Sequence, residues 1–441
     1  MKRKMNFVLA FLIGFFVVMP NVNAKTTVNE QEYDSLEDAI NAVGSAEATF
    51  KITSDEIGSP KTINIPAGAN YTIDGGNFTV NYSFNLDATS EENSSLKVMN
   101  LIMDGKSTLA TAINSQNQST IPNELTLSVT NSTIKNYTNK GFYLTNVKNL
   151  LVDNVNFNNL AFTEQEWYKG DYTIDINLIG VQDAEITIKN STFSGKAGGN
   201  APIKVTQRGG FDDINTDIPY YKVGHSNTPA SVKSLIVENC DFTGVTDNSK
   251  GDVCIGSSPN DDGTARTSAT AYNYKVVAKE GTTTEVYTRS TKEAEESGTN
   301  KPVVVEAGSP LMQLTNYVLN SDDGNINLEV NGTYQLNYYF GDKGATIVNA
   351  PTVTFRSSDD SIVSVSSDGV LTAKKAGTAT IYATYDSGEY NWQVNVVKAT
   401  EEGTSTENVE NPNTSDGVLL FLGLTIVGFA GVALAYRRLH N

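Results

Sequence analysis

The feature that most constrains the fold of this chain is a six-residue sequence motif, here called the asparagine phrase, that recurs between residues 71 and 255. It consists of an aliphatic residue, a variable residue, an asparagine, two further variable residues and a large apolar residue. The copies are Val98–Met103, Val129–Ile134, Val152–Phe157, Ile188–Phe193 and Val237–Phe242, with an earlier copy, Ile73–Phe78, that has Gly75 in the asparagine place. One phrase is too short to bury a core alone, so we predict that the repeats stack into a solenoid whose apolar positions form continuous ladders.

The repeated asparagine suits a bend between two short strands, because it tolerates a left-handed backbone. Strands, bends and stacked asparagines in this order resemble the right-handed parallel β-helix of the pectin-lyase-like superfamily, and the resemblance implies asparagines that face inward at one corner. Ser35-Leu36-Glu37-Asp38 has the spacing of a capping box and predicts a capping helix through Ala46. We therefore expect an all-β chain with a β-helix domain over residues 25–320, of which 256–320 is the least defined part.

A different pattern follows. Residues Phe355–Ile381 contain a Ser-Ser-Asp turn, an Asp-Gly hairpin at Asp368-Gly369 and the strand Ala376–Ile381. They resemble the bacterial Ig-like group 2 domain, which implies a β-sandwich over residues 321–398 that acts as a spacer or an adhesive module. Residues 399–410 are rich in Thr and Glu and are predicted to form a disordered tether.

Both ends of the chain read as export signals. Residues 1–24 have a basic start, an apolar core and a small-residue cleavage site at Ala24, which is typical of a signal peptide. Residues 411–441 contain a polar pentapeptide, an uncharged span at 418–436 and then Arg437-Arg438. The pentapeptide is Asn411, Pro412, Asn413, Thr414 and Ser415.

This C-terminal layout resembles a Gram-positive cell-wall sorting signal. It implies a transmembrane helix in the precursor, cleavage after Thr414, and a sortase and cell-wall peptide as partners. Asn411 stands where the common motif has Leu and Ser415 where it has Gly, so the sortase class stays open, and a permanent membrane anchor or a GPI signal are alternatives. The expected location is secreted, on the cell wall or surface of a Gram-positive bacterium.

Composition excludes some functions. The chain has 32 Lys and Arg against 50 Asp and Glu, and loss of the two ends makes the exported part more acidic still, which disfavours nucleic acid as a partner. His225 is the single histidine of the exported part, so a histidine-bound zinc site is not expected. The motifs around Asp212 and His225 lie in the wrong order for a polygalacturonase, and we assign no catalytic residue.

Candidate site residues fall in three groups. The position before the repeated asparagine is expected to face outward, and its Asp153, Lys189 and Glu238 could bind sugar or calcium or could form a solvated ladder. Exposed aromatic side chains could stack on sugar rings or pack onto the solenoid; they are Trp167, Tyr168, Tyr220 and Tyr221. Cys240 and Cys254 could form a disulfide, which export permits, or remain two buried thiols. We assign no metal ligand and no other cofactor.

The leading hypothesis is a non-enzymatic surface protein, an adhesin or glycan-binding module whose ligand is a carbohydrate or a host protein. The alternative is an extracellular polysaccharide lyase or glycosidase of the pectin-lyase-like superfamily. Converging carboxylates or Lys and Arg in a cleft would favour the enzyme, whereas an open face with aromatic side chains would favour binding.

Overall fold

The computed structural model describes residues 25–87, 92–115, 123–160, 172–207, 230–257, 272–288, 301–348, 350–386 and 388–398. Their regular secondary structure is almost all β-strand, with one large and mostly parallel sheet and a separate Ig-like part. The all-β prediction is therefore confirmed. Among these residues no helix is both long and apolar enough to cross a membrane; the predicted span 418–436 lies outside them.

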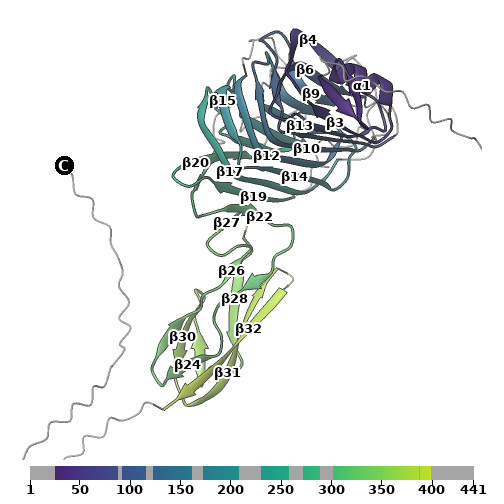
Figure 1. The fold of residues 1–441 in the computed structure, drawn as a ribbon. Coiled ribbons are helices and arrows are strands. Elements are labelled where there is room, and N and C mark those ends of the chain that lie inside the picture. Colours follow the sequence, from purple (N-terminus) through teal and green to yellow (C-terminus); the bar gives the residue numbers. More distant parts are fainter. Residues whose placement is uncertain are drawn as a thin grey trace, which may run out of the picture. The chain divides into compact units, whose positions relative to one another are not determined.

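Successive circuits of the chain lie on one another, so the described parallel strands form three stacks (Figure 1). The first stack consists of β3 (Ala48–Ile52), β5 (Asn70–Asp74), β7 (Ser94–Met99), β14 (Ala184–Lys189), β19 (Asn273–Ala278) and the first parts of β10 (Leu125–Lys135), β12 (Val147–Leu160) and β17 (Val232–Thr246). The second stack consists of β8 (Ile102–Asp104), β15 (Thr192–Lys196), the later parts of β10, β12 and β17, and the start of β6 (Thr79–Leu86).

The third stack begins with the end of β4 (Glu56–Ile65) and the end of β6. It continues with β9 (Thr111–Ser115), β11 (Lys140–Leu144), β13 (Ile174–Leu178), β16 (Ile203–Gln207), β18 (Val253–Ser257) and β20 (Thr283–Thr288). We call these three stacks together the solenoid domain. Strand alternation sends every second side chain inward, where they form one core that includes Phe142, Phe157 and Phe193. The Phe157 and Phe193 rings stack at a centroid distance of 4.9 Å.

The predicted capping helix is present as α1 (Leu36–Val43), beside β1 (Thr26–Val28) and β2 (Gln31–Tyr33). The Ser35 side chain accepts a hydrogen bond from the Asp38 backbone N–H at 3.1 Å, as a capping box requires. The helix ends before Ala46 because Gly44 adopts a left-handed φ of 65° and its N–H bonds back to Ile40.

The other end of the solenoid domain is closed by antiparallel strands. β19 and β20 continue the parallel stacks, whereas β22 (Leu311–Gln313) pairs antiparallel with β19 and β21 (Val303–Glu306) pairs antiparallel with β20. β27 (Thr346–Val348) pairs parallel with β22. The segment whose boundaries the sequence left least defined therefore supplies both the last circuit and the strands that end it.

The Ig-like part has its own core, which includes Leu371, Ile381 and Trp392. Its strands are β23 (Leu319–Asn320), β24 (Ile326–Glu329), β25 (Thr333–Gln335), β26 (Tyr339–Phe340), β28 (Val353–Ser357), β29 (Val363–Val365), β30 (Val370–Ala373), β31 (Gly377–Tyr385) and β32 (Gly388–Val397). β24, β32, β31 and β28 form one sheet, and β25, β30 and β29 form another. Asp368-Gly369 makes the predicted turn, with Gly369 at a φ of 83°.

The repeated asparagines occupy the bend between the first and second stacks, but they do not face inward. Their φ values lie between 49° and 55°, which confirms the left-handed bend; they are Asn100, Asn131, Asn154, Asn190 and Asn239. All but Asn100, which is half-buried, are exposed. Pairs of them still bond between circuits, because Asn154 donates to Asn131 and Asn239 donates to Asn190, each at 2.8 Å.

The residue after the asparagine turns inward in its place. Ser132 and Ser191 are buried at this position, and each hydroxyl accepts a backbone N–H of the preceding circuit, from Leu101 at 3.2 Å and from Val155 at 3.1 Å. A small hydroxyl satisfies a buried N–H at the corner without the bulk of an amide. In the copy Ile73–Phe78, Gly75 is needed because a Cβ there would lie 2.5 Å from the Asn100 carbonyl oxygen.

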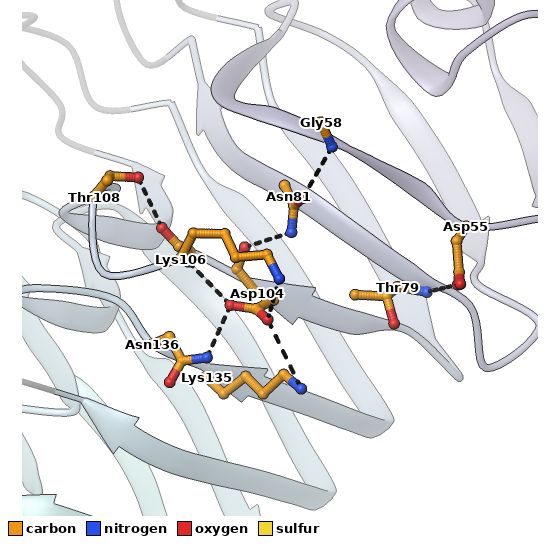
Figure 2. A network of polar contacts seen from close by, with 10 residues as sticks. Asp55, Gly58, Thr79, Asn81, Asp104, Lys106, Thr108, Lys135 and Asn136 are labelled. Atoms are coloured by element: carbon orange, nitrogen blue, oxygen red, sulfur yellow. Dashed lines mark hydrogen bonds and ion pairs between the residues drawn. The ribbon is translucent and has the colours of Figure 1, made fainter.

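A second corner is held by Asp104, at the end of β8 (Figure 2). Its carboxylate accepts hydrogen bonds from the Asn136 side chain at 2.9 Å and the Lys106 backbone N–H at 3.0 Å, and Lys135 lies 3.8 Å away. Burial alone would raise the pKa of Asp104, but these hydrogen bonds and the Lys106 ammonium hold it below its ordinary value. Asn81 bonds to the Asp104 carbonyl oxygen at 3.0 Å, so the corner joins three circuits.

Asp252, before β18, is expected to make the stability of the solenoid domain depend on pH. Burial raises the pKa of its carboxyl to about 6, although it accepts hydrogen bonds from the Glu285 N–H at 2.8 Å and from the Asn248 side chain at 3.0 Å. A carboxyl whose pKa is raised on folding favours the folded state below its unfolded pKa, and this stability is lost as the pH rises through 6. We expect Asp252→Asn to raise the free energy of unfolding at pH 7 by about 2 kcal/mol and to leave it unchanged near pH 4.

Asp241 is the matched control for this prediction, because a salt bridge and hydrogen bonds from Lys279 and Thr243 lower its pKa to about 2. Asp241→Asn is expected to act in the opposite sense, with a loss of stability at pH 7 that shrinks as the pH falls toward 2. Denaturant unfolding at several pH values measures both variants. If Asp252→Asn changed the free energy of unfolding equally at pH 4 and pH 7, this would contradict the raised pKa of Asp252.

Candidate functional site

The strongest candidate site is an outward-facing row on the third stack, one residue from each circuit. In register across β4, β6, β9, β11, β13 and β16 it reads Asn64, Asn85, Asn114, Tyr143, Asp175 and Lys204. The neighbours of these residues along each strand, such as Phe142 and Ile174, are buried in the core, so the row must lie on the outer side of the strands. We call it the third-stack row.

The first half of the third-stack row is a ladder of amides. Asn85 donates to Asn64 at 3.0 Å, and Asn114 donates to Asn85 at 2.8 Å. Each amide has two N–H donors and two acceptor lone pairs, so one ladder bond in each direction leaves further hydrogen-bonding capacity. Asn64 is exposed, and Asn85 and Asn114 are half-buried, so that capacity is directed toward the solvent.

Aromatic and charged side chains follow in the second half. Tyr143 is half-buried, and the Lys140 ammonium lies 5.7 Å from its ring centroid. Asp175 lies between two ammonium groups, Lys140 at 2.9 Å and Lys204 at 2.7 Å. Tyr172 lies against both, with its ring centroid 5.6 Å from Lys140 and 4.6 Å from Lys204.

The charged part of the row is buried although it lies on the outer side of the strands. Asp175 is 5% exposed, and the Lys140 and Lys204 side chains are 12% and 11% exposed. Burial would raise the pKa of Asp175, but the ammonium groups of Lys204 and Lys140 hold it below its ordinary value. A lowered pKa keeps Asp175 as an anion near neutral pH, between two cations, and does not suit it to donate a proton there.

The predicted Asp153, Lys189 and Glu238 also come together, in adjacent register on the first stack. Lys189 lies 3.4 Å from Asp153, and Asn190 donates to Asp153 at 2.7 Å. Lys189 thus separates the two carboxylates that a calcium ion would need. Among the described residues no group of three or more His, Cys, Asp or Glu is placed to hold a metal ion.

Cys240 and Cys254 are both buried thiols that are not bonded to each other, so the structure has the two-thiol alternative and not the bridge. Cys240 faces the core at the corner after Asn239, whereas Cys254 lies on the outer side of the third stack, against Tyr172 and Tyr287. Burial raises the pKa of the Cys240 thiol to about 12, which makes it unreactive.

Several predicted positions lie outside the described residues. They are Ala24, Trp167, Tyr168, Tyr220, Tyr221, and the pentapeptide Asn411, Pro412, Asn413, Thr414 and Ser415.

The sequence reasoning missed Lys140, Asp175 and Lys204, because it followed the asparagine phrase and these strands lack it. A usable signal was present: Asp175 stands between Ile174 and Ile176, and Lys204 between Ile203 and Val205. A charged residue between two aliphatic residues predicts an outward position on a half-buried strand. A shallow recess of ≈ 280 Å³ on the first stack was also not anticipated; its lining includes Asn70, Thr126 and Asn149.

Comparison with known proteins assigns one part of the chain to a family. Residues 319–396 match the family model of the bacterial Ig-like domain (group 2). A search of curated proteins found no match. One similar solved structure is that of surface layer protein SbsC, domains 4–9, with 18% identity and a TM-score of 0.17 over 23% of this chain and 16% of that chain.

A second is the crystal structure of the S-layer protein SbsC domains 4 and 5, with 22% identity and a TM-score of 0.16 over 22% of this chain and 50% of that chain. In both comparisons less than two thirds of the solved chain is covered. The Ig-like match begins at β23, two residues before the boundary expected from the sequence, and covers the second hydrophobic core. Residues 319–396 therefore form a bacterial Ig-like domain of group 2, which is consistent with a cell-surface protein.

Proposed function

We propose that this protein is a cell-wall-anchored surface protein of a Gram-positive bacterium that binds neutral glycans through the third-stack row. In this proposal the solenoid domain is a right-handed, pectin-lyase-like β-helix that presents the row, and the Ig-like domain is a spacer near the wall. The signal-peptide and sorting-signal patterns at residues 1–24 and 411–441 support export and attachment by a sortase.

The observation that carries the proposal is the in-register run of Asn64, Asn85, Asn114 and Tyr143. Amides both donate and accept hydrogen bonds, as sugar hydroxyls do, and a tyrosine ring presents an apolar face to the apolar face of a sugar. Circuits stack about 4.8 Å apart, so an extended glycan could contact one side chain per circuit. These four side chains carry no formal charge, which favours a neutral ligand.

The experiment compares retention of the full-length chain on a panel of immobilised neutral glycans. The double variant Asn85→Ala/Tyr143→Ala is expected to bind at least about tenfold more weakly, because it loses a hydrogen-bonding amide and a stacking ring. The matched control is Asn149→Ala/Thr126→Ala, which removes an exposed amide–hydroxyl pair, bonded at 3.3 Å, from the first stack. Loss of retention in the control, with retention kept in the row variant, would move the site to the first stack and refute the proposal.

The enzyme alternative is favoured by one observation, the convergence of Lys140 and Lys204 on Asp175. Most glycosidases use two carboxyl groups, one of which has a raised pKa. Among the described residues this cluster contains one carboxyl group, that of Asp175, and its pKa is lowered and not raised. Assaying the same glycans for shortened products tests the alternative, since turnover that disappears in Asp175→Asn would replace binding by catalysis as the function.

A further inference from the structure

A recess of ≈ 430 Å³ opens on the Ig-like domain, apart from the third-stack row. It is lined by Asp322, Asp323, Leu336, Asn337, Tyr338, Tyr339, Lys343 and Gly344. All of these residues lie within the span that matches the Ig-like family. The volume falls in the lower part of the range of small-ligand pockets, roughly 300–1,000 Å³.

One wall of this recess is held in place by hydrogen bonds. The Asp323 carboxylate accepts hydrogen bonds from the Tyr334 hydroxyl at 2.8 Å and from the backbone N–H of Asn337 at 2.8 Å. The Asp323 N–H donates to the Ser321 hydroxyl at 3.1 Å, and that hydroxyl also accepts from the buried Trp392 indole at 3.0 Å. The wall is thus tied to the core of the domain, and a ligand would not have to order it.

The opposite groups are accessible. Asp322 and Lys343 form an ion pair in which their side chains are 51% and 73% exposed, and the Tyr339 hydroxyl donates to Asp322 at 3.3 Å. The hydrogen bond from Lys343 holds the pKa of Asp322 below its ordinary value, so Asp322 is a constant acceptor. An acceptor and a donor therefore lie side by side at the opening, next to the Tyr339 ring.

We infer that this recess binds a short neutral saccharide, so that the Ig-like domain is a second binding module in addition to a spacer. A carboxylate accepts a hydrogen bond from one sugar hydroxyl, and an ammonium beside it donates one to the neighbouring hydroxyl. A tyrosine ring covers an apolar sugar face. Asp322, Asp323 and Lys343 together carry a net negative charge, which disfavours anionic ligands. Two sites on one chain would raise the avidity for a glycan that reaches both.

The experiment titrates the full-length chain with neutral disaccharides of glucose, galactose and N-acetylglucosamine by calorimetry. Asp322→Ala and Tyr339→Ala are each expected to weaken binding of the recess ligand at least tenfold, and both should fold because Asp322 is exposed and Tyr339 only half-buried. The matched control is Arg356→Ala. Arg356 also pairs with a carboxylate, Glu389 at 3.1 Å, and covers a tyrosine ring, Tyr382 at 3.7 Å, but it lies on the outer face of the β28–β31–β32 sheet.

Unchanged binding in both Asp322→Ala and Tyr339→Ala, or an equal loss in Arg356→Ala, overturns the inference. The double variant Asn85→Ala/Tyr143→Ala separates it from the proposed function. Binding that is lost only in this double variant keeps the third-stack row and removes the recess. Binding that is lost only in the recess variants supports the recess, and the retention experiment on immobilised glycans then decides on the row separately. A wild-type chain that binds none of the disaccharides overturns the inference.

Discussion

Replacing Asp175 with alanine is expected to destabilise the solenoid domain by about 3–5 kcal/mol, the largest effect of any substitution considered. The change removes the carboxylate that lies 2.9 Å from Lys140 and 2.7 Å from Lys204 and leaves two nearly buried ammonium groups without it. Removing one partner of a buried ion pair is strongly destabilising, because the remaining charge stays desolvated and unpaired. Replacing the whole pair by apolar residues costs much less stability. Denaturant unfolding of the full-length chain measures the loss.

The control for Asp175→Ala is Asp153→Ala, which removes the carboxylate of an ion pair on the first stack. The Lys189 and Asp153 side chains are 37% and 29% exposed, so water replaces the lost partner and the expected loss is below about 1 kcal/mol. Equal effects for the two variants would show that the Asp175 cluster is solvated. Replacing Asp175, Lys140 and Lys204 together by Leu, Met and Met is expected to recover most of the loss, since it removes the buried charges as a set.

Replacing Glu56 with alanine is expected to cost about 3 kcal/mol and to loosen the N-terminal cap. The Glu56 carboxylate is 3% exposed and accepts hydrogen bonds from the Thr26 hydroxyl at 2.6 Å, the Tyr82 hydroxyl at 2.6 Å and the Leu36 N–H at 2.9 Å. Leu36 is the first residue of α1, where a negative charge is favourable. Alanine leaves three buried donors without this acceptor.

Two measurements test this prediction: the free energy of unfolding should fall, and proteolysis near α1 should become faster. Glu56→Gln keeps an acceptor oxygen and is expected to lie between alanine and the wild type. Glu37→Ala is the matched control on the helix itself, because its ion pair with Lys61 is about 40% exposed on both sides. A cap that resists protease equally in Glu56→Ala and Glu37→Ala would contradict the role assigned to Glu56.

Features with a local cause could be predicted from the sequence. Ser35 and Asp38 are three residues apart, so a helix start there needs no distant contact. Asn131 and Asn154 could be placed at bends, because asparagine tolerates a left-handed backbone better than most residue types. Their direction was predicted wrongly, because whether the asparagine or the residue after it faces the core depends on the adjacent circuit.

What the sequence alone determined is the kind of architecture: a repeated phrase that must stack, a helix that caps it, and an Ig-like domain whose turn residues are unmistakable. Only the tertiary structure decided which polar residues meet. Asn85 and Asn114 are 29 residues apart, and Lys140, Asp175 and Lys204 come from three circuits of unequal length. The register of such circuits depends on the length of each intervening loop and on the core that the whole stack shares, and no single repeat contains that information.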